Sequence, residues 1–292
     1  MVPDADSFME FLDELQSRVI PADGAMATLL IERGVPKEAC FEELCASRPE
    51  MVRQVHADYL AAGARLVRTN SFGANSVRLA KHGCEHRVGE LNWLAAQLAG
   101  DAVKGTKARV AASIGPLGLP PEQSRNSDRL AIFLEQMGAL LDGGARIVCL
   151  ETFTLLDELL VAVEAKHTLH HCPVIASVVC DARGMMPDGT PLAEAFARLR
   201  AADVDVVGVN CGTDPAQTLA SLRLAGITGL ISAFPSAGLP TEEAGGLKFP
   251  LGPAECASGA RALAEAGVRL IGGCCGQGPA HIAAFTESLP QE

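Results

Sequence analysis

Short apolar runs alternate along this chain with longer stretches whose apolar residues have helical spacing. One phrase recurs, in which a helix ends in a small residue or glycine and a β-rich apolar run follows at once. It is found at residues 62–67, 143–148 and 266–271, with a looser copy at 202–207. A glycine-capped helix that leads straight into a buried strand is typical of parallel βα units. The pattern therefore predicts a parallel α/β fold.

Eight apolar runs have the character of buried strands. They lie near residues 18–23, 65–70, 108–114, 146–151, 174–180, 205–210, 228–234 and 268–273. Helical patterns fall between them, for example at 51–62, 76–81, 87–104, 130–142, 156–169 and 192–202. Eight uninterrupted βα units predict an α/β fold of the (β/α)8 TIM barrel type, with a doubly wound open sheet as the alternative. We expect a single domain over residues 1–292, with a lead-in helix at 1–17 and the barrel at 18–289.

Composition and charge narrow the class of protein. Of the 292 residues 48% are hydrophobic, and the net charge of −11 argues against nucleic acid or an anionic membrane surface as a partner. The acidic N-terminus differs from a signal or transit peptide, and no apolar run approaches the roughly 20 residues of a membrane span. Ten cysteines without a secretory signal indicate a reducing compartment. We therefore expect a cytoplasmic enzyme.

Three cysteines stand where apolar runs end. One run leads into Cys211, and the last run leads through two glycines into Cys274 and Cys275. Consecutive side chains of a strand point to opposite faces, so the last strand has to stop at Gly273 and turn if both sulfurs are to reach one point. Three thiols at two strand ends suggest a soft metal such as zinc, with one coordination position open. Buried cysteines that act as small hydrophobes are the alternative.

The barrel geometry predicts that these cysteines lie together. Side chains of alternate strands share a layer inside such barrels, and active sites lie at the carboxyl ends of the strands. Two more polar residues, Asn70 and Glu151, end even-numbered strands at that face. Glu151 could instead only favour a helix N-terminus. Asp23 and Gly24, which end the first strand, form either a simple turn or a backbone-lined site for a small ligand.

Three thiolates on zinc also constrain the chemistry. Such a site is a poor Lewis acid for activating water, whereas a thiolate substrate in the fourth position stays electron-rich, so the site suits alkyl transfer to sulfur better than hydrolysis. The chain has no dinucleotide fingerprint, no Walker-type loop and no Gly-x-Ser-x-Gly elbow. His167, His170 and His171 have metal-binding spacing, but they end a helix at the opposite face, so we expect a structural role.

Several motifs at these positions match one known family. They are Asp23-Gly24-Ala25, Thr69-Asn70-Ser71-Phe72-Gly73-Ala74-Asn75, Ile114-Gly115-Pro116, Glu151-Thr152-Phe153, Gly208-Val209-Asn210-Cys211 and Gly272-Gly273-Cys274-Cys275-Gly276. From about residue 23 to 285 the chain resembles the homocysteine-binding barrels. These are the homocysteine S-methyltransferases, betaine–homocysteine methyltransferase and the N-terminal barrel of cobalamin-dependent methionine synthase.

The resemblance implies roles for individual residues. The three strand-end cysteines would bind zinc, which holds the homocysteine thiolate, and Asp23, Gly24 and Glu151 would hold its amino-acid end. Asn70 and Phe72 lie in the shared segment 69–75, and we expect them to contact substrate. The chain is most similar to the methionine synthase barrel, but it has Ser236 where that subgroup often has asparagine. That difference leaves open which group fills the fourth zinc position before substrate arrives.

We therefore expect a zinc-dependent methyltransferase that moves a methyl group onto the thiol of L-homocysteine to give methionine. Two alternatives remain. One is a non-autonomous, thiol-presenting module that docks a separate corrinoid or methyl-carrier protein, and the other is methylation of a different small thiol.

The low aromatic content bears on the methyl donor. Quaternary ammonium donors such as betaine are usually held over aromatic faces, and this chain has 4% aromatic residues. Phe41, Phe72 and Phe153 are the aromatic residues best placed near the barrel mouth. We expect a methyl-corrinoid delivered by a partner, or a sulfonium such as S-methylmethionine, to serve better than betaine.

Overall fold

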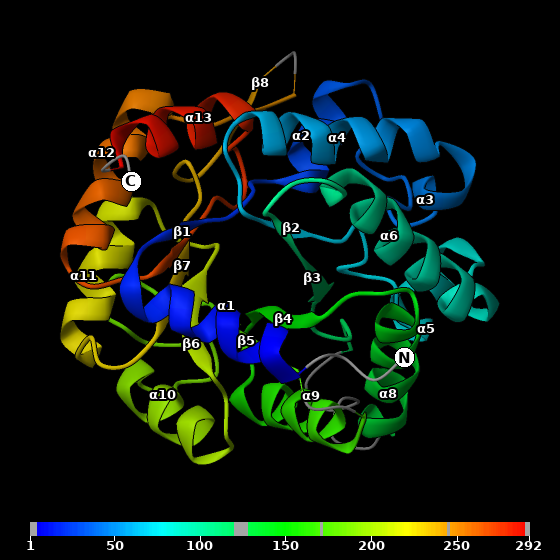
Figure 1. Cartoon of the computed structure of the whole chain (residues 1–292), viewed down its shortest axis with the longest axis horizontal. Coiled ribbons are helices and arrows are strands. Elements are labelled where there is room, and N and C mark those ends of the chain that lie inside the picture. Colours follow the sequence, from blue (N-terminus) through cyan, green and yellow to red (C-terminus); the bar gives the residue numbers. More distant parts are fainter. Residues whose placement is uncertain (1–4, 120–127, 170–171, 244–245, 290–292) are drawn as a thin grey trace.

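Eight parallel strands form the centre of the molecule (Figure 1). The computed structural model describes residues 5–119, 128–169, 172–243 and 246–289. Its strands follow the predicted runs, and the hydrogen-bonded order is β1-β10-β7-β6-β5-β4-β3-β2. They are β1 (Ile20–Pro21), β2 (Leu66–Arg68), β3 (Arg109–Ile114), β4 (Ile147–Phe153), β5 (Val174–Val178), β6 (Val206–Asn210), β7 (Ile231–Phe234) and β10 (Leu270–Ile271).

The two ends of this order meet, which closes the ring. A parallel bridge joins Ala22 to Leu66, the Asp23 amide donates to the Leu66 carbonyl at 2.9 Å, and the Arg65 amide donates to the Pro21 carbonyl at 2.7 Å. The predicted TIM barrel is therefore confirmed. Nearly every strand residue is buried, because helices cover the outer face and side chains fill the interior.

Helices surround the barrel in the βα order that the sequence predicted. Four of them begin with proline, which suits the first turn because its missing N–H has no intrahelical partner there. The α-helices are α1 (Ala5–Ser17), α2 (Met26–Glu32), α3 (Leu44–Ser47), α4 (Pro49–Ala61), α5 (Ser76–Leu79), α6 (Val88–Val103), α8 (Arg129–Asp142), α9 (Leu156–Leu169), α10 (Leu192–Ala201), α11 (Pro215–Ala225), α12 (Pro253–Glu265) and α13 (Pro279–Ser288). Two 3₁₀ turns, η1 (Ala80–His82) and η2 (Glu85–Arg87), precede α6.

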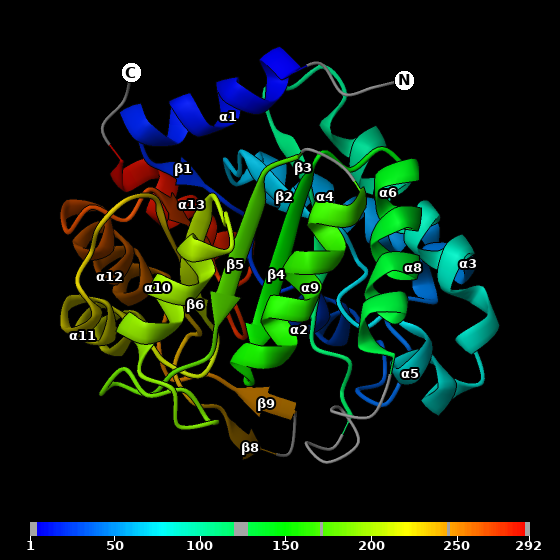
Figure 2. The same cartoon turned by 90° about the horizontal axis from the view of Figure 1, so that it is seen from below.

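The lead-in helix α1 covers the amino-terminal end of the barrel. Its Phe11 and Leu15 are buried and join the apolar cluster inside the ring, which also contains Ile147 and Val206. Figure 2 shows α1 at one end of the molecule and the short strands β8 (Thr241–Glu243) and β9 (Gly246–Lys248) at the other. The helix therefore closes the end of the barrel opposite to the predicted active site.

Three local features differ from the sequence expectation. The long segment after β7 contains the antiparallel hairpin β8–β9, whose three-residue strands are too short to give a period-two signal. Strand β2 ends at Arg68, before Asn70, and β4 continues through an irregularity to Phe153.

Among the described residues, no helix combines the length and apolar content needed to cross a membrane.

Candidate active site

A pocket of about 290 Å³ opens at the carboxyl ends of the strands. The residues that line it come from the ends of β1, β2, β3, β4, β6 and β10, from the start of α2, and from the loops that follow β1, β2 and α2. All the site residues predicted from the sequence line this pocket, namely Asp23, Gly24, Asn70, Phe72, Glu151, Cys211, Cys274 and Cys275. The structure therefore brings together side chains that are up to about 250 positions apart in the chain.

The three cysteines form one cluster, as the barrel geometry predicted. The Sγ atoms of Cys211 and Cys275 are 3.9 Å apart, those of Cys274 and Cys275 are 4.0 Å apart, and all three lie within 4.8 Å of one another. Tetrahedral zinc with Zn–S bonds of about 2.3 Å requires S–S separations of roughly 3.8 Å. The donor set and its spacing therefore fit a zinc ion.

Backbone turns aim the sulfurs at this point. Cys211 has a φ of +61°, a left-handed conformation that is uncommon for a residue with a Cβ. Strand β10 ends at Ile271, and the Cys274 amide donates to the Pro235 carbonyl at 2.8 Å. Gly276 has a φ of +79°, and a Cβ there would lie 2.2 Å from the Phe249 ring. Only glycine allows the chain to turn under Phe249 directly after the cysteine pair.

The three thiols shift one another's pKa values through their mutual hydrogen bonds. Hydrogen bonds from Cys274 and Cys275 hold the pKa of Cys211 well below its ordinary value, since both neighbours stabilise its thiolate. The same hydrogen bond to Cys211 raises the pKa of Cys275 to about 11 and that of Cys274 well above its ordinary value. A cation bound by all three sulfurs would replace those protons.

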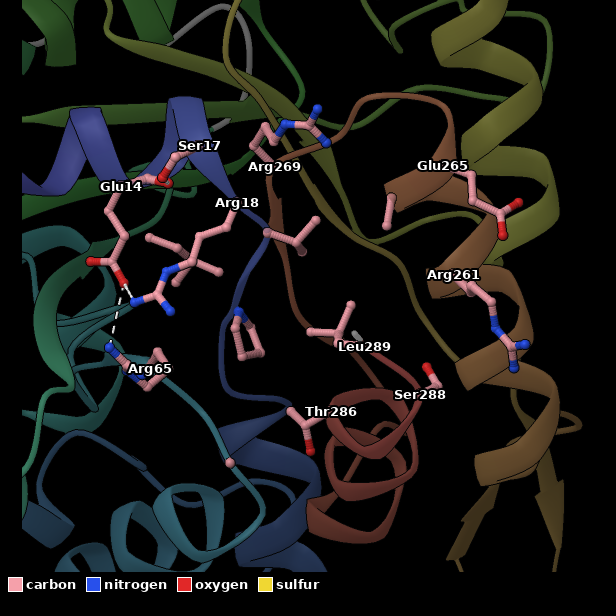
Figure 3. Close-up of a pocket in the computed structure, with 15 residues that line it drawn as sticks. Glu14, Ser17, Arg18, Arg65, Arg261, Glu265, Arg269, Thr286, Ser288 and Leu289 are labelled. Atoms are coloured by element: carbon pink, nitrogen blue, oxygen red, sulfur yellow. Dashed lines mark hydrogen bonds and ion pairs between the residues drawn. The ribbon is translucent and has the colours of Figure 1, made fainter. Parts of the chain in front are cut away.

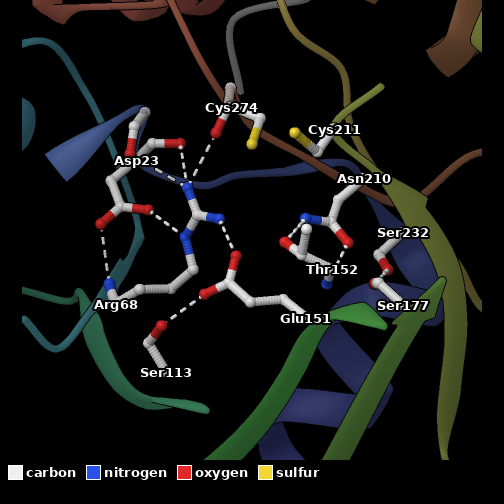
Figure 4. Close-up of polar contacts among 12 residues, drawn as sticks. Asp23, Arg68, Ser113, Glu151, Thr152, Ser177, Asn210, Cys211, Ser232 and Cys274 are labelled. Carbon is white, nitrogen blue, oxygen red and sulfur yellow. Dashed lines mark hydrogen bonds and ion pairs between the residues drawn. The ribbon is translucent and has the colours of Figure 1, made fainter. Parts of the chain in front are cut away.

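Arg68 lies at the centre of the other half of the pocket (Figure 4). Its Nε donates to Asp23 Oδ1 and its Nη1 to Glu151 Oε2, both at 2.7 Å, while its backbone amide donates to Asp23 Oδ2 at 2.7 Å. The Nη2 group donates to the carbonyls of Gly273 at 2.8 Å and Gly24 at 3.0 Å. The guanidinium also lies 4.6 Å from the centroid of the Phe234 ring. One arginine thus connects the ends of β1, β2, β4 and β10.

This cluster is buried and carries more negative than positive charge. Burial by itself would lower the pKa of Arg68, but Asp23 and Glu151 outweigh it and hold that pKa well above its ordinary value. Burial raises the pKa of Asp23, and the Arg68 guanidinium opposes the rise. With two carboxylates around one guanidinium, this end of the pocket favours a further small cation.

Glu151 is held by an irregular strand. The pairing of β4 with β5 shifts register between Leu150 and Phe153, and Thr152 has a φ of +64°. Asn210 fixes that conformation, because its Oδ1 accepts from the Thr152 amide at 2.7 Å and its Nδ2 donates to Thr152 Oγ1 at 2.6 Å. Ser113 Oγ donates to Glu151 Oε1 at 2.5 Å. The carboxylate therefore has a fixed position inside the barrel mouth.

Two predicted substrate residues line the pocket, although protein groups already contact them. Asn70 Nδ2 donates to the Phe41 carbonyl at 2.7 Å, which anchors the loop before α3. The ring of Phe72 covers Gly115, where a Cβ would lie 2.4 Å from it. A side chain at Gly24 would meet the Gln277 carbonyl oxygen at 2.1 Å, so only glycine fits there. The contacts of these residues with substrate stay predictions.

One expected aromatic residue lies elsewhere. Phe153 is fully buried, and its ring centroid is 6.1 Å from that of Phe133 on α8. It therefore packs between barrel and helices, and the expectation that Phe153 lies near the mouth was wrong.

Of the three histidines with metal-binding spacing, His167 has its Nε2 2.9 Å from the Ala202 carbonyl oxygen, and His170 and His171 fall outside the described residues.

Sequence reasoning missed Arg68, Ser113 and Asn210. Arg68 did give a signal, since a charge inside an otherwise apolar strand needs a buried partner. Its partners come from distant strands, so they could not be assigned from local pattern.

A larger cavity of about 830 Å³ lies at the opposite end of the barrel, under α1 (Figure 3). Arg18 and Arg65 line it and both contact Glu14, and Arg269 and Arg261 lie at its edge. Its apolar wall includes Val19, Ile20 and Leu289.

No group of three or more potential metal ligands other than the three cysteines is present in the described part of the chain.

Comparisons with known proteins agree with this geometry. A family profile described as homocysteine S-methyltransferase matches residues 21–289. The chain is 34% identical over 296 residues to the methionine synthases of Mycobacterium leprae and Mycobacterium tuberculosis. Those alignments cover 94% of this chain but only 24% and 25% of the two relatives, so the chain spans about a quarter of their length.

The chain is also similar to solved structures of a homocysteine methyltransferase. The oxidized form of the homocysteine methyltransferase MmuM from Escherichia coli superposes with a TM-score of 0.78 at 28% identity, covering 93% of this chain and 96% of that one. The metallated form of the same enzyme superposes with a TM-score of 0.77 at the same coverage.

Proposed function

Because this chain belongs to the homocysteine S-methyltransferase family, we propose that it transfers a methyl group to the thiol of L-homocysteine, giving methionine. The main supporting observation is that one pocket contains both a cluster of three thiols and an acidic cluster suited to an ammonium group. A small amino acid with a terminal thiol has complementary groups at its two ends.

The metal in this proposal is zinc, held by Cys211, Cys274 and Cys275. The fit rests on the sulfur spacing described above and on the preference of zinc for thiolate ligands. Zinc bound by three thiolates would keep the acceptor thiol ionised near neutral pH, where a free thiol is only a few per cent ionised. The metallated form known for MmuM is consistent with a metal at this position.

The remaining residues bind and orient the amino acid. Glu151 and Asp23 each have carboxylate lone pairs that accept hydrogen bonds from the substrate ammonium, and the Gly24 backbone borders the same space. The acceptor sulfur then attacks the donor methyl in line. A sulfur–carbon bond forms as the donor–carbon bond breaks, and its electron pair leaves with the donor.

The aromatic residues near the pocket bear on the donor. Among the aromatic side chains of the described residues, only Phe41 and Phe72 line the pocket. The Tyr59 hydroxyl is buried and donates to the Ala25 carbonyl at 3.0 Å, and Trp93 lies on α6, 45% exposed. Two phenylalanines make an incomplete cage for a quaternary ammonium group. We therefore propose S-methylmethionine or a methyl-corrinoid as the donor rather than betaine.

A second candidate function is a module that presents the thiol to a separate corrinoid protein. It is favoured by the likeness to two methionine synthases, of which this chain spans about a quarter. Leu239 and Leu247, which are 75% and 54% exposed, lie on the segment around the hairpin at the mouth. Exposed apolar residues beside an active site suit a docking protein.

The cellular location is part of the proposal. All ten cysteines are free, which suits a reducing compartment. We infer a cytoplasmic location, where homocysteine and small methyl donors would be the partners.

A donor screen tests the proposal. Zinc-loaded protein is incubated with L-homocysteine and, separately, S-methylmethionine, betaine, free methylcobalamin or a methyl-corrinoid carrier protein, and methionine is followed by mass spectrometry. We expect turnover with S-methylmethionine or with the carrier. Turnover only with the carrier would favour the second candidate. No methionine from any donor, with protein that is folded and contains zinc, would refute the methyltransferase assignment.

A further inference from the structure

Arg68 is buried between the acidic cluster and the thiol cluster of the pocket, although the proposed reaction gives it no chemical step. It is 7% exposed and lies between the two carboxylates expected to hold the substrate ammonium. On the side of the thiol cluster, Arg68 Nη2 donates to the Gly273 carbonyl at 2.8 Å, and Gly273 directly precedes Cys274. The arginine thus contacts both functional halves of the pocket.

Further bonds make this connection rigid. The Gly273 amide donates to the Asp23 carbonyl at 2.9 Å, while the Asp23 carboxylate accepts from both Nε and the backbone amide of Arg68. A Cβ on Gly273 would lie 2.5 Å from the Gln277 side chain, so this backbone has no room to shift on that side. A planar guanidinium keeps its donors in a fixed fork, so it transmits geometry in a way that a lysine cannot.

We propose that Arg68 is a positioning residue that fixes the distance between the acidic cluster and the thiol cluster and thereby selects the length of the thiol acceptor. This inference rests on the proposed function of the same pocket. It assigns Arg68 no contact with the transferred methyl group. Its role is to hold Glu151, Asp23 and the Cys274 backbone in one spatial relation.

The physical consequence is discrimination by chain length. Cysteine is one methylene shorter than homocysteine, and 2-amino-5-mercaptopentanoate is one methylene longer. A pocket with fixed ends binds the matching homologue best, and one methylene typically changes recognition by 10- to 200-fold. If Arg68 is replaced, the acidic cluster and the thiol cluster can move independently. A thiol amino acid that is one methylene too short or too long then loses less binding affinity.

The test uses calorimetric binding of the three thiol amino acids to zinc-loaded protein, with zinc measured after each titration. Wild-type protein is expected to bind homocysteine at least about 10-fold more tightly than either homologue. Arg68→Lys keeps the positive charge but not the fork, and Arg68→Met removes both. Both variants are expected to bind the three thiols within about 3-fold of one another. Arg269→Met, at the opposite end of the barrel, is the matched control and should keep the wild-type preference.

The ratio of affinities distinguishes positioning from general support of the fold. A purely structural role of Arg68 would weaken binding of all three thiols by the same factor, and that result would overturn the inference. If Arg68→Met does not fold, Arg68→Lys decides, and an unchanged preference in it would also overturn the inference.

The outcome for the wild-type protein separates this inference from the proposed function. A wild-type preference for another chain length that Arg68→Lys abolishes would support the inference and refute homocysteine as the acceptor. Binding of none of the three thiols by zinc-loaded wild-type protein would refute both.

Discussion

The two ends of the barrel contain charged clusters of inverted composition. At the carboxyl end, Arg68 pairs with two carboxylates, Asp23 and Glu151, and all three side chains are at most 8% exposed. At the amino end, Glu14 of α1 pairs with Arg18, Arg65 and Arg109, whose side chains are 20–35% exposed. We call these the Arg68 cluster and the Glu14 cluster.

The difference indicates a separate role for each cluster. The Arg68 cluster joins four strand ends at the floor of a pocket and has an excess of negative charge, so it suits a cationic ligand. The Glu14 cluster joins α1 to residues just before β2 and at the start of β3, so it attaches a helix to the barrel. The larger cavity lies beside the Glu14 cluster, whereas the smaller pocket contains the thiols. Converging reactive groups, not volume, identify the functional end.

The largest expected effect comes from the thiol cluster beside Arg68. Cys211→Ser or Cys275→Ala should lose most of the bound zinc, because two thiolates and an open position hold the ion poorly. Methyl transfer should fall by roughly 1,000-fold or more, while the thermal midpoint changes little, because the site lies at the functional face. Elemental analysis and circular dichroism measure the two quantities. Cys84→Ser, outside the pocket, is the control, and full zinc in Cys211→Ser would contradict the assignment.

The next largest expected effect is a loss of homocysteine affinity when the Arg68 cluster is changed. Glu151→Gln removes a charged acceptor for the substrate ammonium, so homocysteine affinity measured by calorimetry should fall by about 10- to 100-fold. Zinc content should not change. Glu164→Gln on the exposed face of α9 is the matched control. Unaltered affinity in Glu151→Gln would remove Glu151 from the substrate site.

At the other end, Glu14→Gln should affect stability and not binding. The substitution weakens three partly exposed ion pairs, for which a loss of about 1–2 kcal/mol in unfolding free energy is expected. Asp13→Asn, an exposed position on the same helix, should have almost no effect. A change in homocysteine affinity in Glu14→Gln would break the distinction between the two clusters.

The stability difference between wild type and Glu14→Gln should depend on pH. Burial tends to raise the pKa of Glu14, but hydrogen bonds from Arg109 and Arg18 outweigh it and lower that pKa below its ordinary value. A depressed carboxyl pKa contributes stability above the unfolded pKa of about 4.5, and this stability is lost as pH falls through the folded pKa. Thermal melts of wild type and Glu14→Gln should therefore converge as pH falls below about 4.5. A constant gap at all pH values would contradict this account.

The smallest expected effect concerns the support of Glu151. Asn210→Ala removes both hydrogen bonds to Thr152, each worth about 1 kcal/mol, so the irregular turn of β4 becomes less fixed. Homocysteine affinity should fall by about 3- to 10-fold with zinc retained. Thr152→Ala, which keeps the backbone bond to Asn210 Oδ1, should show a smaller loss. An effect as large as that of Glu151→Gln would indicate that Asn210 contacts substrate itself.

The fold could be predicted from the sequence because its signals are local. Each strand is an apolar run of a few residues, and four of the preceding helices end in a small residue or glycine, so eight βα units could be counted without knowing their contacts. Cys211 and the pair Cys274 and Cys275 stood at strand ends, and the general geometry of such barrels then placed them together. The positions of the three clustered cysteines, which we propose as metal ligands, thus followed from the strand count.

The tertiary structure alone decided how the acidic end is built. Arg68 and Glu151 are 83 residues apart, and their pairing depends on the register between strands and on closure of the ring. The positive φ of Thr152 and its bonds to Asn210 depend on a local shift in β-pairing that no hydrophobic pattern encodes. Periodicity reports which faces are buried, whereas the choice of partner for a buried charge is settled only when distant strands come into contact.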